Sequence, residues 1–182
     1  SDPAVYEQWY KVEHTDRNTK AVYGLCELYR DKIKEAKVLA NPGCYVTASI
    51  LALVPLLKYN LIELKNIVVD AKSGASGAGR TLALGAHFTE LVDNFRAYGV
   101  GTHRHTPEIE QVYSAFAGQE VVISFTPHLL PVDRGIFATC YADLKPGVSK
   151  EQVAAAYANM YADQYFIRLL WYGVYPAIKL VR

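Results

Sequence analysis

The stretch that decides the fold is "ANPGCYVTASILALVPLLK", residues 40–58. Three turn-forming residues, Asn41, Pro42 and Gly43, precede a run in which apolar residues recur with helical spacing. One face of a helix over residues 44–58 carries Val46, Ile50, Leu53, Val54 and Leu57. The sequence therefore predicts a core helix that begins at Cys44, directly after a tight turn.

A cysteine in this place has four alternative roles: a small hydrophobic residue, half of a disulfide, a metal ligand or a nucleophile. The three cysteines of the chain, Cys26, Cys44 and Cys140, are odd in number, widely spaced and form no CxxC pair. This pattern argues against a disulfide framework and against a structural zinc site. It indicates a reducing compartment, so we expect a cytoplasmic protein.

The composition is that of a globular protein. The chain has 182 residues, of which 51% are hydrophobic, and its net charge is +1. These values suit one domain with a real core, or one domain and a piece of another. A near-neutral charge gives no sign of a nucleic-acid or membrane-surface partner. The longest apolar run, residues 48–57, is too short to span a bilayer, and no signal peptide is visible.

Strands and helices alternate around the core helix, whereas residues 1–37 are polar and broken. Strands are predicted at residues 37–40 and 66–74, and two more within 120–144 read as neighbouring antiparallel strands joined by a proline-containing loop. Together with the helices, these strands predict an α+β fold: a mixed, largely antiparallel sheet with helices packed on one face. The pattern is already under way at the first residue and unfinished at the last, so we expect a piece of a longer protein.

Two further helices carry their own start and stop residues. A helix over residues 105–118 has Pro107 in its first turn and Gly118 as its terminator. A helix over residues 149–164 has Ser149 as N-cap and a glutamine three residues later, which predicts a capping box.

The position of Cys44 suits a nucleophile. Backbone N–H groups at a helix start stabilise a thiolate and can also hold an oxyanion after the sulfur has attacked a carbonyl. The alternative is a small buried hydrophobic residue, and position alone does not choose between the two.

"THRHTPEIEQ" supplies two histidines, His103 and His105, just before a helix. A thiol nucleophile needs a base to accept its proton, and this pair beside Arg104 and Glu108 could be that base with its orienting partners. The alternatives are a chance surface pair or a metal site. For a metal, only two nitrogens stand at i and i+2, with no matching third ligand, so no metal is expected.

Two other segments suit anion binding. "SGASGAGR", residues 73–80, is a glycine-rich loop after a strand, of the kind that lets backbone approach a phosphate. It matches neither the P-loop nor the dinucleotide fingerprint, and a flexible linker explains it equally well. In "TPHLLPVDRG", Arg134 could clamp a carboxylate or phosphate, or it could be a solvated loop residue. Taken together, the thiol, the histidines, the loop and the arginines suit acyl transfer through a thioester from an anionic substrate.

Four motifs in order resemble the N-acetyl-gamma-glutamyl-phosphate reductase family: "NPGCY", "DAKSGASGAGR", "HRHTPEIEQ" and "SFTPHLLPVDRGIFAT". They lie between about residue 20 and residue 145. The wider relatives are aspartate-semialdehyde and glyceraldehyde-3-phosphate dehydrogenases, whose C-terminal catalytic domain this fold is expected to resemble. The resemblance implies an NADPH-dependent reduction of an acyl phosphate to N-acetylglutamate semialdehyde, a step of arginine biosynthesis.

The resemblance also implies roles for individual residues. Cys44 would be the nucleophile that displaces phosphate, and His103 the acid/base. The substrate-binding residues would be His105, Glu108, Arg104 and Arg134. The cofactor-binding residues would be Ser73, Gly74, Ser76 and Gly77. We also expect a homo-oligomer, a dimer or a tetramer, assembled through the sheet.

The chain departs from the family pattern in two positions and in extent. Val46 stands where the family usually has proline, and Cys26 replaces a proline, so neither change removes chemistry. Family members begin with a Rossmann domain, of which residues 1–40 resemble the trailing end, whereas residues 41–182 resemble the catalytic and oligomerisation domain. We therefore expect the chain alone to be inactive, since most of the NADPH site would lie elsewhere.

Two alternatives stay open at this point. One is another semialdehyde dehydrogenase, such as an aspartate-semialdehyde dehydrogenase, which would need a different carboxylate-binding pattern. The other is a non-enzymatic self-association domain in which the thiol is incidental.

Overall fold

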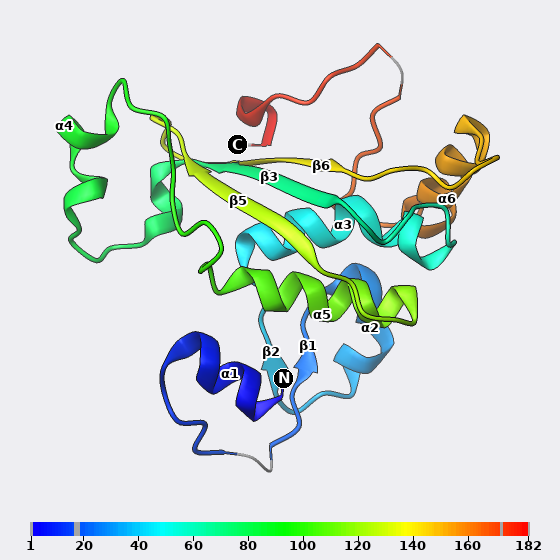
Figure 1. Cartoon of the computed structure of the whole chain (residues 1–182), viewed down its shortest axis with the longest axis horizontal. Coiled ribbons are helices and arrows are strands. Elements are labelled where there is room, and N and C mark those ends of the chain that lie inside the picture. Colours follow the sequence, from blue (N-terminus) through cyan, green and yellow to red (C-terminus); the bar gives the residue numbers. More distant parts are fainter. Residues whose placement is uncertain (1, 17–18, 172, 182) are drawn as a thin grey trace.

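The computed structural model describes residues 2–16, 19–171 and 173–181. A four-stranded sheet lies over two helices, and a smaller layer with the N-terminal segment lies beyond them (Figure 1). The helices in chain order are α1 (Pro3–Tyr10), α2 (Cys26–Lys34), α3 (Cys44–Lys58), α4 (Phe88–Leu91), α5 (His105–Ala117) and α6 (Lys150–Tyr161). The strands are β1 (Val22–Tyr23), β2 (Leu39–Ala40), β3 (Ile67–Ser73), β4 (Arg96–Ala97), β5 (Ile123–Leu129) and β6 (Ile136–Tyr141).

The large sheet has the order β4-β5-β3-β6, and the small one pairs β1 with β2. β3 runs parallel to β5, whereas the β3–β6 and β4–β5 pairs are antiparallel. The helices α3 and α5 lie against one face of this sheet (Figure 1). The predicted α+β fold with a mixed, largely antiparallel sheet and helices on one face is therefore confirmed.

The expectation that the two strands within 120–144 are neighbours is wrong, because β3 lies between β5 and β6. Crossing one strand takes about 10 Å, which the connection at residues 130–135 is long enough to span. The end of β3 holds this connection: the N–H of Leu130 donates to the carbonyl of Ser73 at 2.9 Å, and the N–H of Gly74 donates to the carbonyl of Gly135 at 3.0 Å. The proline-containing loop thus wraps around the end of the strand it crosses.

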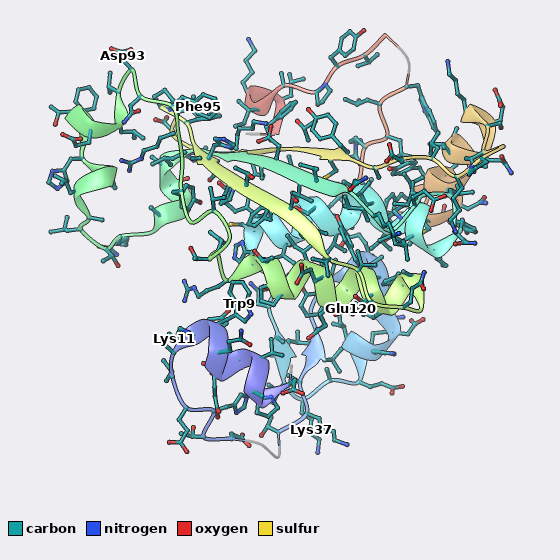
Figure 2. All side chains as sticks on the ribbon, viewed as in Figure 1. Trp9, Lys11, Lys37, Asp93, Phe95 and Glu120 are labelled. Atoms are coloured by element: carbon teal, nitrogen blue, oxygen red, sulfur yellow. The ribbon has the colours of Figure 1, made fainter. Side chains whose placement is uncertain are left out.

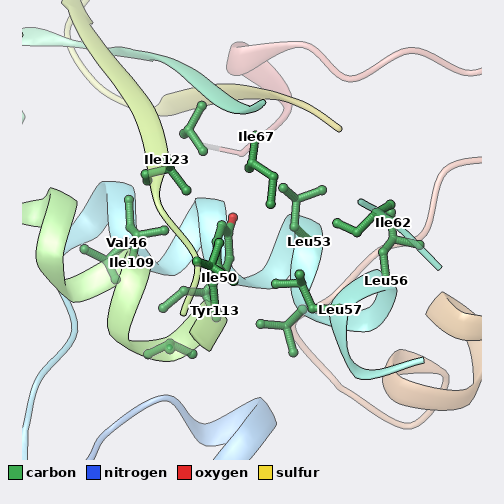
Figure 3. Packing of buried hydrophobic residues seen from close by; sticks show 14 of the residues in the cluster. Val46, Ile50, Leu53, Leu56, Leu57, Ile62, Ile67, Ile109, Tyr113 and Ile123 are labelled. Carbon is green, nitrogen blue, oxygen red and sulfur yellow. The ribbon is translucent and has the colours of Figure 1, made fainter. Parts of the chain in front are cut away.

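The core lies between the sheet and α3 (Figure 3). Side chains of β3 alternate between buried and half-buried, and the buried ones include Val69 and Ala71, both 0% exposed. All the α3 residues predicted to share the buried face are buried: Val46, Ile50, Leu53, Val54 and Leu57. Burying a side chain of this size contributes about 1.5–3 kcal/mol, so this face fixes α3, and with it Cys44, against the sheet.

α3 continues through Pro55, which lacks a backbone N–H, and a tyrosine of α6 donates the missing hydrogen bond. Pro55 has no N–H to donate to the carbonyl of Leu51, one turn earlier. The hydroxyl of Tyr161 donates to that carbonyl at 2.9 Å, and the hydroxyl of Tyr157 donates to the next one, that of Ala52, at 2.6 Å. α6 is therefore bonded to α3 at the point where α3 lacks a bond of its own.

The predicted terminator of α5 and the predicted capping box of α6 are confirmed. Gly118 caps α5 in the left-handed conformation, with φ 72°. Ser149 and Gln152 form the predicted capping box of α6, although the helix ends at Tyr161 rather than Gln164. Within the described ranges, no helix has both the length and the apolar character that crossing a bilayer requires.

Three segments have structure that the sequence did not predict. The helices α1 and α2 lie in the stretch that reads as polar and broken. Residues 75–95 form an arm with two 3-10 turns and α4, which extends away from the sheet (Figure 1). Asp93 lies at the outer end of the arm, whereas Phe95 lies back beside the sheet, with its ring centroid 5.1 Å from that of His128 (Figure 2). Apolar side chains on this arm are exposed, and Leu82 is 93% exposed.

Candidate active site

Cys44 is the first residue of α3, and its side chain is exposed at the wall of a cavity of about 510 Å³. The cavity lies where the start of α3, the end of β3, the arm and the segment before α5 meet. Its lining residues are Cys44, Tyr45, Ser73, Gly74, Gly77, Ala78, Ala83, Gly85, Ala86, Arg96, Tyr98, His103, Arg104, His105 and Leu129.

The turn before Cys44 is held from two sides. Oε1 of Glu108 accepts the N–H of Gly43 at 3.2 Å and the hydroxyl of Tyr23 at 2.7 Å. On the other side, Nε2 of His105 lies so near Gly43 that a Cβ placed there would be 2.3 Å away. Any larger residue at this position would displace the imidazole, and α5 thereby sets the direction in which the thiol leaves the turn.

The two predicted histidines come together. His103 Nδ1 accepts the backbone N–H of His105 at 3.1 Å, so the proton of a neutral His103 ring is on Nε2. The ring centroids of the pair are 4.6 Å apart. The rings of Tyr45, Tyr98 and Phe125 contact His103 edge-on and fix its orientation.

Burial keeps both imidazoles neutral at pH 7. Desolvation is the largest cause that lowers the pKa of His103 to about 4, and electrostatic interactions with His105 and Arg104 also lower it. Desolvation and Arg104 also lower the pKa of His105. A neutral imidazole has one nitrogen with a lone pair that can accept a proton from a thiol. In His103 this nitrogen is Nδ1, which already accepts the N–H of His105, so His103 must give up that bond before it can act as the base.

The predicted glycine loop forms one wall of the cavity. The loop is fixed to residues 132–135: the N–H of Ala75 donates to the carbonyl of Val132 at 2.9 Å, and the N–H of Ser76 donates to that of Asp133 at 2.8 Å. A Cβ on Gly74 would lie 2.6 Å from the backbone nitrogen of Arg134, which explains a glycine there. Ser73, Gly74 and Gly77 line the cavity, whereas Ser76 does not.

The remaining predicted residues have different places. Arg104 lines the cavity and stacks over the Tyr10 ring, with Cζ 5.0 Å from its centroid. Glu108 does not line the cavity, and its carboxylate accepts hydrogen bonds from Gly43 and Tyr23. Arg134 is exposed and is not among the lining residues either; its backbone nitrogen and Cα lie close to Gly74.

Arg96 and Tyr98 line the cavity, although the sequence did not predict them. The hydroxyl of Tyr98 donates to that of Tyr45 at 3.1 Å, and the hydroxyl of Tyr45 donates to the carbonyl of His128 at 3.0 Å. Both residues come from "NFRAYG", which has no motif of its own. Only the pairing of β4 with β5 brings this segment to Cys44.

The cavity is positively biased. Its lining contains two arginines and no aspartate or glutamate. Across the described part of the chain, no three histidine, cysteine or acidic side chains are grouped so that they could hold a metal ion. A thiol, two neutral histidines and two guanidinium groups form a site for nucleophilic attack on an anionic substrate.

Comparison with known proteins gives consistent relatives. The N-acetyl-gamma-glutamyl-phosphate reductase of Pelotomaculum thermopropionicum is 54% identical over 182 residues, which are 99% of this chain and 52% of that protein. The enzyme of the same name from Desulforamulus reducens is 52% identical over 180 residues, 98% of this chain and 52% of that protein. The chain therefore spans about half the length of the curated relatives it matches.

Solved structures show the same fold at low identity. A probable aspartate-semialdehyde dehydrogenase from Pseudomonas aeruginosa aligns with a TM-score of 0.59 and 17% identity, over 90% of this chain and 55% of that one. Aspartate semialdehyde dehydrogenase II from Vibrio cholerae aligns with a TM-score of 0.53 and 15% identity, over 78% of this chain and 49% of that one. The model of the semialdehyde dehydrogenase dimerisation domain matches residues 44–182, and the chain belongs to this family.

Proposed function

We propose that the protein containing this chain reduces N-acetyl-gamma-glutamyl phosphate to N-acetylglutamate semialdehyde with NADPH, and that this chain is its catalytic domain. The observation that carries the proposal is the position of Cys44, at a helix start beside two neutral histidines and in a cavity without acidic residues. The relatives of that name, of which this chain covers about half the length, support the proposal.

The chain's own groups account for the first half of the reaction. The thiol of Cys44 gives its proton to an imidazole nitrogen, and Sγ attacks the acyl carbon. The first N–H groups of α3 have no partner within the helix, so they are free to stabilise the oxyanion. When the bond from the acyl carbon to the phosphate oxygen breaks, phosphate leaves and a thioester on Cys44 remains.

The residues beside the thiol fit one end of a nicotinamide cofactor. Gly74, Gly77 and Ala78 carry no more than a methyl group, so this wall of the cavity leaves room for a ring. Ser73, Gly74, Ser76 and Gly77 are proposed to border it. When bound, NADPH supplies the hydride that reduces the thioester carbon. Cys44 is then released as a thiolate and regains its proton from the histidine.

The acid/base role belongs to one of two histidines. The motif resemblance gives it to His103, which is held by aromatic rings and by the N–H of His105. His105 has its Nε2 packed against Gly43, the residue before the nucleophile. Single His103→Asn and His105→Asn variants distinguish the two. Only the replacement of the histidine that accepts the proton should flatten the pH dependence of Cys44 alkylation.

Self-association through the open sheet face is proposed as well. This face carries Asp70 and Lys72 of β3, His128 of β5 and Tyr141 of β6, and the family model describes a dimerisation domain. Tyr141→Arg should shift the sedimentation of the intact protein towards the monomer. Tyr59→Arg, at the exposed end of α3, should not.

An assay of the intact protein tests the proposed reaction. The substrates are the acyl phosphates of N-acetylglutamate and of aspartate, each with NADPH. Cys44→Ser should abolish turnover. Cys26→Ser should leave it unchanged, although Cys26 is also exposed at the first position of a helix. A preference for aspartyl phosphate, or turnover by Cys44→Ser, would overturn the proposal.

A further inference from the structure

The two arginines of the Cys44 cavity are held in different ways. Arg104 is exposed and stacks over the ring of Tyr10. Arg96 is half-buried on the short strand β4, at the base of the arm that walls the cavity. These differences indicate that Arg96 is the more fixed of the two cations.

Arg96 is positioned by the arm itself. Its Nη2 donates to the carbonyl of Gly85 at 2.9 Å, and both residues line the cavity. A Cβ placed on Gly85 would lie 2.0 Å from that nitrogen, so the absence of a side chain at Gly85 is what admits the guanidinium. The arm and the strand therefore hold the charge at the cavity wall.

The charge of Arg96 has no counter-ion among the described residues. No carboxylate forms an ion pair with it, and none lines the cavity. A guanidinium has five N–H donors, and the bond to Gly85 uses only one. A half-buried cation with free donors stabilises an anion that enters the cavity, and its planar fork matches the oxygens of phosphate or carboxylate.

We propose that Arg96 binds an anionic oxygen of the substrate, on either its phosphate or its carboxylate group, while Cys44 attacks the acyl carbon. The identity of the substrate rests on the proposed function. The attraction of an anion to the cavity does not, and it can be measured without turnover.

Alkylation of Cys44 in the intact protein tests the attraction directly. Iodoacetate and iodoacetamide react with the same thiol, but only iodoacetate is an anion. Arg96→Gln should lower the ratio of the two rate constants about five-fold, and the effect should shrink with added salt. Arg96→Lys, which keeps the charge, should retain most of the ratio. Arg168→Gln is the matched control, since that exposed arginine also donates to a backbone carbonyl but does not line the cavity.

Steady-state kinetics of the reverse reaction identify the bound group. A rise in the KM for inorganic phosphate in Arg96→Gln assigns the phosphate, and a rise in the KM for the semialdehyde assigns the carboxylate. Unchanged alkylation ratios in Arg96→Gln would overturn the proposal and leave Arg96 as an anchor of Gly85 only. If the ratio falls but the intact protein does not reduce N-acetyl-gamma-glutamyl phosphate, the proposed function fails and the anion site stands.

Discussion

Oε1 of Glu108 accepts the backbone N–H of Gly43 at 3.2 Å, across 65 residues of sequence. Gly43 is the residue before Cys44 and the N-cap of α3, so the first turn of α5 positions the first turn of α3. The same carboxylate oxygen accepts the hydroxyl of Tyr23, which ties the N-terminal layer to the same point. Glu108, expected to contact substrate, has a place in the structure that suits orientation of the nucleophile.

Replacing Glu108 with alanine should therefore reduce the rate of Cys44 chemistry. A hydrogen bond to a charged group contributes about 1.5–3 kcal/mol, so the loss in kcat should be roughly 10- to 100-fold. Glu108→Gln keeps an acceptor oxygen and should recover part of it. Glu110→Gln is the control on the same helix, because Oε1 of Glu110 accepts the N–H of Ile123, away from the thiol. Equal kcat losses in the Glu110 and Glu108 variants would contradict the orienting role.

Gly43→Ala should impair activity while leaving the fold intact. Gly43 has φ −65°, which alanine adopts readily, but the added Cβ would lie 2.3 Å from Nε2 of His105. The imidazole must move, and the base is displaced from the nucleophile. We expect kcat to fall by about 100-fold or more, since a misplacement of about 1 Å has effects of that size.

A double-mutant cycle checks the cause. If the clash with the imidazole is the origin, Gly43→Ala should have little further effect on Cys44 alkylation once His105→Ala is present. Circular dichroism and the urea midpoint report whether the fold is retained. Additive effects of the two changes would show that Gly43 acts through another contact.

Tyr161→Phe should destabilise the protein by about 1–2 kcal/mol, because it leaves the carbonyl of Leu51 without a donor. Pro55→Ala returns an N–H to that carbonyl, so Tyr161→Phe should matter less in the Pro55→Ala background. The measurement is the free energy of unfolding by urea for the four proteins of the cycle. Tyr165→Phe, at an exposed tyrosine, should change it by less than about 0.5 kcal/mol. An equal effect of Tyr161→Phe in both backgrounds would contradict the pairing with Pro55.

Local signals predicted the parts of the fold that local interactions determine. The apolar spacing of residues 44–58 predicts α3, and its buried face is the one expected. Gly118 and the Ser149–Gln152 pair end and begin helices through contacts a few residues apart. The thiol and both histidines were predicted for the same reason, since each lies at a helix start with a recognisable motif.

Features that depend on long-range pairing were missed or wrong. β3 inserts between β5 and β6, and no pattern within the 120–144 stretch carries that information. Arg96 reaches the cavity only because it pairs with Leu129, 33 positions away, in the β4–β5 register. The domain boundary at residue 40 and the roles of the individual site residues stay predictions.

The half-buried histidine pair makes the stability of the protein depend on pH, with a sign that follows from the desolvation of the rings. Desolvation lowers the pKa of His103 from 6.5 to about 4. As the pH falls through about 6.5, the unfolded chain binds a proton at this residue, whereas the folded chain does so only near pH 4. Between these values the unfolded state holds more protons, so the free energy of unfolding falls as the pH falls.

His103→Asn removes this contribution, and its stability should therefore fall less steeply than that of the wild type between pH 6.5 and pH 4.5. Burial also lowers the pKa of His105, so part of the pH dependence of the stability remains in the variant. The measurement is the urea midpoint at a series of pH values in a buffer of constant ionic strength. His128→Asn is the control, since His128 lies on the open sheet face with Nδ1 3.2 Å from the carboxylate of Asp70 and outside the cavity. Parallel curves for the wild type and His103→Asn would show that burial does not keep this imidazole neutral.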